Sequence, residues 1–288
     1  MQATREQSAP LEGKPRGSIS NLPWWALIIV AAGLLIIYFI VSDVNYQATF
    51  KFLVVGVITT LRITLFAFPI ATVIGLFTGI ARLSKNPVLF TISTIYVEVI
   101  RGIPLVVLML MIAFAVVPLF VQTVNALGAW GSTWAGEGIL GQLFMGMADY
   151  SIRSIPMEMR SIIALALGYG AFEAEIFRAG IQSISKGQME AARSLGMSYI
   201  QSMRFIILPQ AIRRVLPPLG NDFIAMLKDS SLATVLAVNE LTQLTRIRRS
   251  STFRVMEAFN VAAFLYLAMT LLLSAAVRVL EKRMKIEE

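Results

Sequence analysis

Six charged side chains interrupt the apolar stretches of this sequence, and their placement needs a chemical explanation. The chain contains no histidine and no cysteine, so the commonest metal ligand, the commonest general base and any thiolate nucleophile are missing. We therefore predict no catalytic residue and no metal site. Charged groups in apolar segments are instead typical of a path for a charged or polar solute. The six candidates for such a path are Glu98, Arg101, Glu173, Glu175, Arg178 and Asp222.

The spacing of these charges also permits a purely structural interpretation. Glu98 and Arg101 are three residues apart, as are Glu175 and Arg178, so each pair can neutralise itself on one helix face and tie helices together. Glu173 is different, because Arg178 already serves as a partner for Glu175. For Glu173, a structural role and contact with a solute remain open alternatives.

The composition identifies the surroundings in which these charges must be held. Of the 288 residues, 57% are apolar and only 15% are charged, and the mean hydropathy is +0.72. A soluble domain has about 25% charged residues, so lipid must be the solvent for much of this chain. The net charge of +8 is explained by basic cytoplasmic loops. No basic patch interleaved with aromatic residues indicates binding to nucleic acid.

Six apolar segments can cross a bilayer, which predicts an all-α membrane protein with a five-span core and one extra N-terminal transmembrane helix. An even number of spans places both termini on one side of the membrane. The basic residues place that side in the cytoplasm, because the inner segments carry 12 of them and the outer segments 7. The arginines between Arg246 and Arg254 run against this bias. The predicted spans are residues 24–41, 50–81, 88–120, 158–183, 205–227 and 255–280.

These spans also predict how the chain is divided. The glycine-rich segment 121–156 is predicted to be a long outer loop with a short surface helix at 139–147. The other predicted parts are a cytoplasmic polar tail (1–22), the extra helix with a short outer loop (23–48), the main transmembrane domain (49–283) and a C-terminal tail (284–288).

Helix rise predicts the depth of the six charges in the membrane. At about 1.5 Å per residue, Glu98 lies roughly 16 Å from the Asn86–Pro87 turn, and Glu175 is about as far from Lys186. We therefore expect the charges to form one layer near the middle of the bilayer, where each costs at least about 2.5–3.5 kcal/mol. Four of the six are acids, which favours a basic or broadly polar solute over an anionic one.

A polar segment between two predicted spans, residues 184–209, carries a motif with regular spacing. It begins as a helix, because glutamate and alanine are strong helix formers, and we expect it to end at a glycine. Met189, Ala192 and Gly196 would share one face, where small side chains allow another protein to approach closely. An ordinary loop helix with a solvated surface is the alternative. The residues of the motif are Gly187, Glu190, Ala191, Ala192, Gly196, Ile206, Leu208 and Pro209.

This motif resembles the signature of importer permeases of the ATP-binding cassette family, Glu-Ala-Ala, three residues, Gly, nine residues, Ile, one residue, Leu-Pro. The stretches from Tyr96 to Leu105 and from Gly170 to Gly180 are similar to those of the permeases for histidine, glutamine, glutamate and arginine. The resemblance covers roughly residues 50–283. Ile103 stands where that group has threonine, and Leu108 where it usually has glutamine.

The resemblance implies a function and a set of partners. The chain would be the membrane-spanning permease subunit of an amino-acid importer in the bacterial plasma (inner) membrane. It would pair with a second permease subunit, identical or homologous, with two ATPase subunits docking on the motif segment. An external binding protein would deliver the amino acid. The sequence has no Gly-x4-Gly-Lys-Ser/Thr phosphate loop, so we expect the partner ATPase to bind ATP and magnesium, and no cofactor in this chain.

Two other classes of protein remain as alternatives. An ion-coupled secondary amino-acid transporter would be expected to show inverted repeats, and none is visible in the sequence. A membrane enzyme could use Lys228 with Ser230 or Ser231 as a dyad. The adjacent Asp229 and the lack of an oxyanion signature argue against that enzyme.

Overall fold

The computed structural model describes residues 24–136 and 138–284, and these residues fold entirely into helices without a strand. The predicted N-terminal tail and all but the first residue of the predicted C-terminal tail lie outside this part. The helices are α1 (Trp24–Ser42), α2 (Val44–Ala81), α3 (Pro87–Gly102), α4 (Leu105–Met111), the π-helix η2 (Ile112–Val116), α5 (Val117–Ser132), α6 (Ile139–Ala148), the 3-10 helix η3 (Ile152–Ser154), α7 (Met157–Gln182), α8 (Lys186–Ser194), α9 (Tyr199–Ser202), the π-helix η4 (Met203–Ile207), α10 (Leu208–Asp229), the 3-10 helix η5 (Ser230–Leu236), α11 (Leu241–Thr252) and α12 (Val255–Met284).

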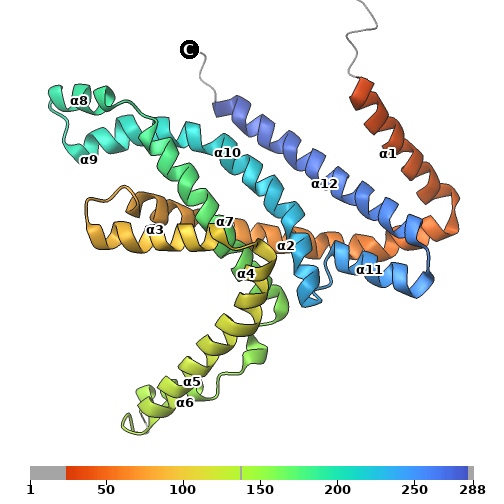
Figure 1. Ribbon diagram of the computed structural model, residues 1–288, viewed down its shortest axis with the longest axis horizontal. Helices are drawn as coiled ribbons and strands as arrows, with labels where there is room; N and C mark the ends of the chain where they lie inside the picture. The colour runs from red at the N-terminus through yellow and green to blue at the C-terminus, as the bar shows by residue number, and fades with distance from the viewer. Residues whose placement is uncertain (1–23, 137, 285–288) are drawn as a thin grey trace, which may run out of the picture.

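The longest helix, α2, is the scaffold on which the others pack (Figure 1). It begins at Asp43, whose carboxylate accepts the backbone N–H groups of Asn45 and Tyr46 as an N-cap. Its glycines allow close packing, since a methyl group at Gly75 or Gly79 would lie 2.7 Å from atoms of α7. Small residues therefore bring α2 and α7 close enough for α7 to present its charged side chains against α2.

The main core lies where α2, α4, α7 and α10 meet. Ile63, Leu108, Leu165 and Met226 are fully buried there, one from each helix. Burying a leucine or isoleucine side chain stabilises a fold by about 1.5–3 kcal/mol in water. In lipid that driving force is absent between helices, so close van der Waals contact must hold this core together.

The fold class agrees with the all-α membrane protein that the sequence predicts. Three helical segments are long and apolar enough to cross a membrane: Val44–Ala81, Leu105–Ser132 and Val255–Lys282. Helices α1, α7 and α10 occupy the positions of the other predicted spans. The number of crossings and the orientation of the termini remain predictions.

One prediction was wrong in its secondary structure. The segment after Phe120 is not a loop, because the helical run from Leu105 continues to Ser132 and α6 folds back along α5. The glycines that suggested a loop allow this hairpin to pack closely, since a methyl group at Gly128 would lie 2.2 Å from the backbone nitrogen of Ala148. The short helix predicted at 139–147 is confirmed as α6. Figure 1 shows this hairpin projecting away from the other helices.

Candidate functional site

The motif segment between α7 and α10 forms a helix that ends in a glycine turn. Gly196 has a φ of +83°, a left-handed conformation that glycine adopts without steric cost. The N–H of Gly196 donates to the carbonyl of Arg193 at 3.0 Å, and the N–H of Met197 donates to the carbonyl of Ala192 at 3.2 Å. These bonds satisfy carbonyls that the end of α8 would otherwise leave free. The helix therefore ends at the predicted glycine, and the reason is its backbone conformation.

A capping box restarts the helix two residues after this turn. The Ser198 hydroxyl accepts the N–H of Gln201, and the Gln201 side chain accepts the N–H of Ser198. The short α9 continues through η4 into α10, where Pro209 lies in the first turn. Proline inside a helix loses one hydrogen bond and clashes with the preceding turn. The wider π-helical turn of η4 directly before Pro209 accommodates it.

The structure corrects the predicted docking face of α8. Met189 packs with Ile206 and Ile207 in a small cluster, and Ala192 is also buried. These residues face the chain's own helices, because a helix of only nine residues is held in place by packing of its apolar face. The outward face instead presents Glu190, Ala191 and Gly196, which are exposed.

Sequence reasoning missed several exposed apolar side chains beside this turn. Leu195 is 84% exposed and Ile200 is 75% exposed, and Tyr199 is also exposed. Large apolar residues that no part of the chain covers are typical of a surface for another protein. Their occurrence inside a polar segment was a signal that could have identified them. They surround Gly196 and enlarge the candidate docking surface.

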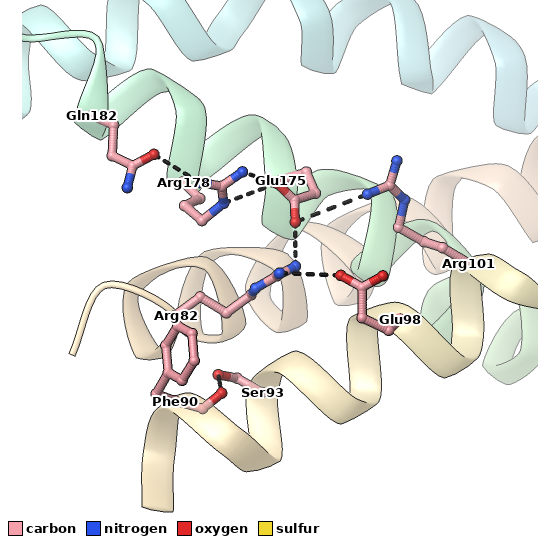
Figure 2. A network of polar contacts seen from close by, with 8 residues as sticks. All are labelled: Arg82, Phe90, Ser93, Glu98, Arg101, Glu175, Arg178 and Gln182. Carbon is pink, nitrogen blue, oxygen red and sulfur yellow. Dashed lines mark hydrogen bonds and ion pairs between the residues drawn. The ribbon is translucent and has the colours of Figure 1, made fainter. Parts of the chain in front are cut away.

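The second candidate feature is a network of charges that joins three helices (Figure 2). Glu175 of α7 contacts Arg82, the C-cap residue of α2, and accepts from Arg178 at 2.6 and 2.9 Å. Arg82 also reaches Glu98 of α3 at 3.2 Å, and Arg101 approaches Glu175 at 3.9 Å. Within this network, three arginines surround two glutamates and leave one positive charge in excess.

This network corrects one expectation. Glu175 and Arg178 pair as predicted, but Glu98 pairs with Arg82, and the described part of the chain has no ion pair between Glu98 and Arg101. Arg82 directly follows the last residue of α2, so the network ties the C-terminal end of α2 to α3 and α7. The depth of the six charges in the membrane remains a prediction. Sequence reasoning missed Arg82 because basic residues at the end of a span are expected in a loop.

Glu173 is the charged residue that the structure buries most deeply. It is 0% exposed on α7, and a methyl group at Gly75 of α2 would lie 2.7 Å from its Cβ. Neither carboxylate oxygen has an ion pair or a hydrogen bond of good geometry in the described part of the chain, and the neighbouring donor, the Thr72 hydroxyl one turn before Gly75, makes no such bond either. Buried polar atoms are almost always hydrogen-bonded, so these unsatisfied groups need an explanation.

Asp222 of α10 is the second acid without a partner. Its Oδ2 is buried and has no hydrogen bond among the described residues. A hollow of about 360 Å³ lies between α2, α10 and α12, with Thr72, Gly220 and Phe223 among its lining residues. Glu173 and Asp222 thus have no ion-pair partner among the described residues, whereas the acids of the network in Figure 2 are neutralised. Glu173 and Asp222 are the strongest candidates for contact with a cationic group.

A sequence profile described as "Binding-protein-dependent transport system inner membrane component" matches residues 71–286. The glutamine transport system permease protein GlnP of Escherichia coli (strain K12) is 35% identical over 234 residues, covering 81% of this chain and 93% of that protein. The arginine transport system permease protein ArgU of Corynebacterium glutamicum is 32% identical over 297 residues, covering 97% of this chain and 85% of that protein.

A solved structure gives the same result for the fold. The crystal structure of an amino acid ABC transporter with histidines contains a chain that is 36% identical to this one. The two chains superpose with a TM-score of 0.65, over 84% of this chain and 97% of the other.

Proposed function

Since the chain belongs to the inner membrane components of binding-protein-dependent transport systems, as a permease subunit of an amino-acid ABC importer, we propose that it imports a basic or broadly polar amino acid. It is a multi-pass inner membrane protein and a component of a transporter. In the proposed cycle, an external binding protein delivers the amino acid, and separate ATPase subunits hydrolyse ATP and supply the driving force.

The observation that carries the proposed substrate is a pair of acids without ion-pair partners among the described residues, the buried Glu173 and the half-buried Asp222. Two unit charges 4 Å apart attract by about 4 kcal/mol at an effective dielectric constant of 20. A guanidinium or ammonium group that entered between α2, α7 and α10 would gain such an attraction and supply hydrogen-bond donors. A glutamate side chain would be repelled. Relatives for arginine and for glutamine are compatible with this proposal.

The test is uptake by the complete complex, reconstituted in proteoliposomes with its ATPase subunits and binding protein. Glu173→Gln keeps the shape of the side chain and removes its charge. We expect arginine or lysine uptake to fall by about tenfold, which corresponds to about 1.4 kcal/mol, and glutamine uptake to change by less than about twofold. Glu98→Gln is the matched control, since the Glu98 side chain is 66% exposed and pairs with Arg82. An equal loss for every substrate would make Glu173 structural, and selective uptake of glutamate by the unmodified complex would overturn the proposal.

We also propose that the motif segment transmits the ATPase movement to the membrane helices. The residues of the proposed coupling segment are Gly187, Glu190, Ala191, Ala192, Gly196, Ile206, Leu208 and Pro209. Ala192 and Ile206 would act by holding α8 against α10, whereas Glu190 and Ala191 would contact the ATPase directly. Copurification of the ATPase subunits with Glu190→Arg or Ala191→Arg variants tests this proposal, and undiminished binding by both would contradict it.

The proposed topology places six spans in the membrane with both termini on the side of the motif segment. In Figure 1, α8, the first turn of α1 and the last turn of α12 all lie toward the upper side of the view, which supports the proposal. Two copies of the permease, or this subunit with a homologous one, would enclose the path. An ion-coupled secondary transporter is the alternative. It would take up amino acids without ATP or added subunits, whereas the proposed importer requires both.

A further inference from the structure

The arginine-rich helix α11 lies on the side of the molecule away from the motif segment. The chain leaves the motif segment through α10, whose 22 residues span about 33 Å, and reaches α11 after η5. Helix α11 runs antiparallel along the first part of α2, because Leu241 contacts Gly56 and Arg248 donates to the Thr49 hydroxyl at 3.2 Å. Basic residues are unfavourable on the outer side of a membrane protein, so this cluster needs an explanation.

The four arginines of the segment are held differently. Arg248 is directed back toward α2, where its guanidinium lies 6.0 Å from the Phe52 ring. Arg254 pairs with Glu257 at 3.3 Å. Arg246 and Arg249 are exposed and form no ion pair within residues 24–136 and 138–284. Two positive charges on this surface therefore remain without a counter-charge.

These two arginines line a surface hollow of about 490 Å³ that contains no acidic side chain. Its other lining residues are Gln243, Ile247, Ser250 and Ser251. The Ser250 and Ser251 hydroxyls already donate to the carbonyls of Arg246 and Arg248, so the available donors are the two guanidinium groups and the Gln243 amide. The planar guanidinium matches phosphate oxygens in pairs. The donor set therefore fits a phosphate group.

A second hollow of about 280 Å³ adjoins the first and is more apolar. Arg249 and Ser250 belong to both hollows, and Phe253 and Val255 complete the second. Phe253 is 87% exposed and Met256 is 67% exposed, so an uncovered apolar surface continues from here onto α12. A donor-lined hollow next to an apolar one fits an amphiphile better than it fits the acidic surface of a soluble protein.

Both hollows lie beside the start of the apolar part of α12, which begins at Val255. Asn260 of α12 donates to the Tyr46 hydroxyl at 3.2 Å, beside the turn at Asp43 between α1 and α2. A turn between two apolar helices is expected at a membrane surface, and α11 packs along both α2 and α12. Arg246 and Arg249 therefore lie beside apolar helices, where a lipid is available to them.

From these observations we propose that α11 and the start of α12 form a binding site for one anionic phospholipid in the outer leaflet. Arg246 and Arg249 bind the phosphate of the headgroup, with the Gln243 amide as an additional donor. Phe253, Val255 and Met256 contact the glycerol and acyl region. The lipid supplies the counter-charge that the described residues lack on this surface. This inference depends on the membrane location and the proposed topology of the chain, and not on its substrate or its coupling to ATP.

The experiment measures lipid retention by the full-length chain. The protein is incorporated in mixed phosphatidylglycerol and phosphatidylcholine bilayers, extracted with mild detergent and washed, and the retained lipids are quantified by mass spectrometry. We expect phosphatidylglycerol to be enriched over its share of the bilayer. Each of Arg246→Gln and Arg249→Gln should lower that enrichment by roughly fivefold, whereas Arg249→Lys should keep most of it. Arg254→Gln is the matched control, because Glu257 already neutralises Arg254, and it should change the enrichment by less than twofold.

Other results would overturn the proposal. Unchanged enrichment in a folded Arg246→Gln/Arg249→Gln double variant, judged by its helical circular dichroism, would remove the lipid site. If that variant also loses stimulation of ATP hydrolysis by the binding protein, the surface belongs to a protein partner. Release of the retained phosphatidylglycerol by excess inorganic phosphate would indicate a site for small anions. The single variants keep the test decisive if the double variant does not fold.

Discussion

Replacing Gly196 by alanine is expected to uncouple transport from ATP hydrolysis without removing the protein from the membrane. The turn that ends α8 requires a φ of +83°, and a left-handed backbone costs an alanine about 1–2 kcal/mol. A methyl group at this position would meet no atom within 4 Å. The expected effect therefore comes from the backbone conformation and not from a steric clash within the chain.

This energy sets the size of the effect. A cost of about 1–2 kcal/mol lowers the population of the native turn, relative to alternative conformations, by roughly 5- to 30-fold. The exposed side chains of Leu195 and Ile200 lie on either side of the turn, so a different turn would move them relative to each other. Uptake should fall by up to this factor, with the full effect where the native turn is only marginally favoured in the parent protein. The Gly196→Asn variant should have an intermediate effect, because asparagine tolerates the left-handed region better than alanine does.

The assay compares uptake, ATP hydrolysis and copurification of the ATPase subunits for the reconstituted complex. Gly33→Ala is the control, because Gly33 lies within helix α1, outside the motif segment, and its added methyl group would meet no atom within 4 Å. Alanine favours a helix over glycine by about 0.5–1 kcal/mol, so this variant should keep normal uptake. Normal uptake by a well-expressed Gly196→Ala protein would refute the reasoning. Equal losses in both variants would show that the effect does not come from the turn at Gly196.

Three further predictions concern packing, charge and topology. Gly75→Ala should lower the stability of the purified protein by about 1–3 kcal/mol, since its methyl group would approach the Cβ of Glu173 to 2.7 Å. Thermal unfolding in detergent measures this loss. The control Gly33→Ala, which has open space around the added methyl group, should leave the melting temperature unchanged. Arg82→Gln leaves Glu175 with fewer partners and should lower the free energy of unfolding by about 1–3 kcal/mol in the same assay. A melting temperature equal to that of the parent protein would show that Arg178 alone satisfies Glu175. A cysteine placed at Ser8 should be labelled only from the cytoplasmic side, which membrane-impermeant maleimide can test cleanly because the chain has no native cysteine, and labelling from outside intact cells would reverse the topology.

Local sequence determined much of what this protein is. The excess of apolar residues required lipid, and the spacing from Gly187 to Pro209 predicted a short helix that stops at a glycine. Helix formation depends on neighbouring residues and on the solvent around them, so both features can be inferred without knowing the fold. The absence of histidine and cysteine likewise limits the chemistry, because no arrangement of the chain can supply a side chain that its sequence lacks.

Contacts between distant segments could not be inferred in this way. The pairing of Arg82 with Glu175 joins residues 93 positions apart, and nothing local distinguishes it from the expected pairing of Glu98 with Arg101. The glycines after Phe120 indicated a loop, but Gly128 and Gly131 instead allow α5 and α6 to pack closely. A glycine permits both outcomes, because its lack of a Cβ allows an unusual backbone as well as a near neighbour.

The functional distinction among the charges was likewise decided only in three dimensions. By sequence alone, Glu173 and Glu175 are two acids on the same apolar helix, two residues apart. A separation of two residues turns them by about 200° around the helix axis, so Glu175 meets three arginines while Glu173 is buried against Gly75 without a partner among the described residues. The sequence by itself determined that charges lie within the membrane domain. Helix packing decided which charges are neutralised and which have no partner among the described residues.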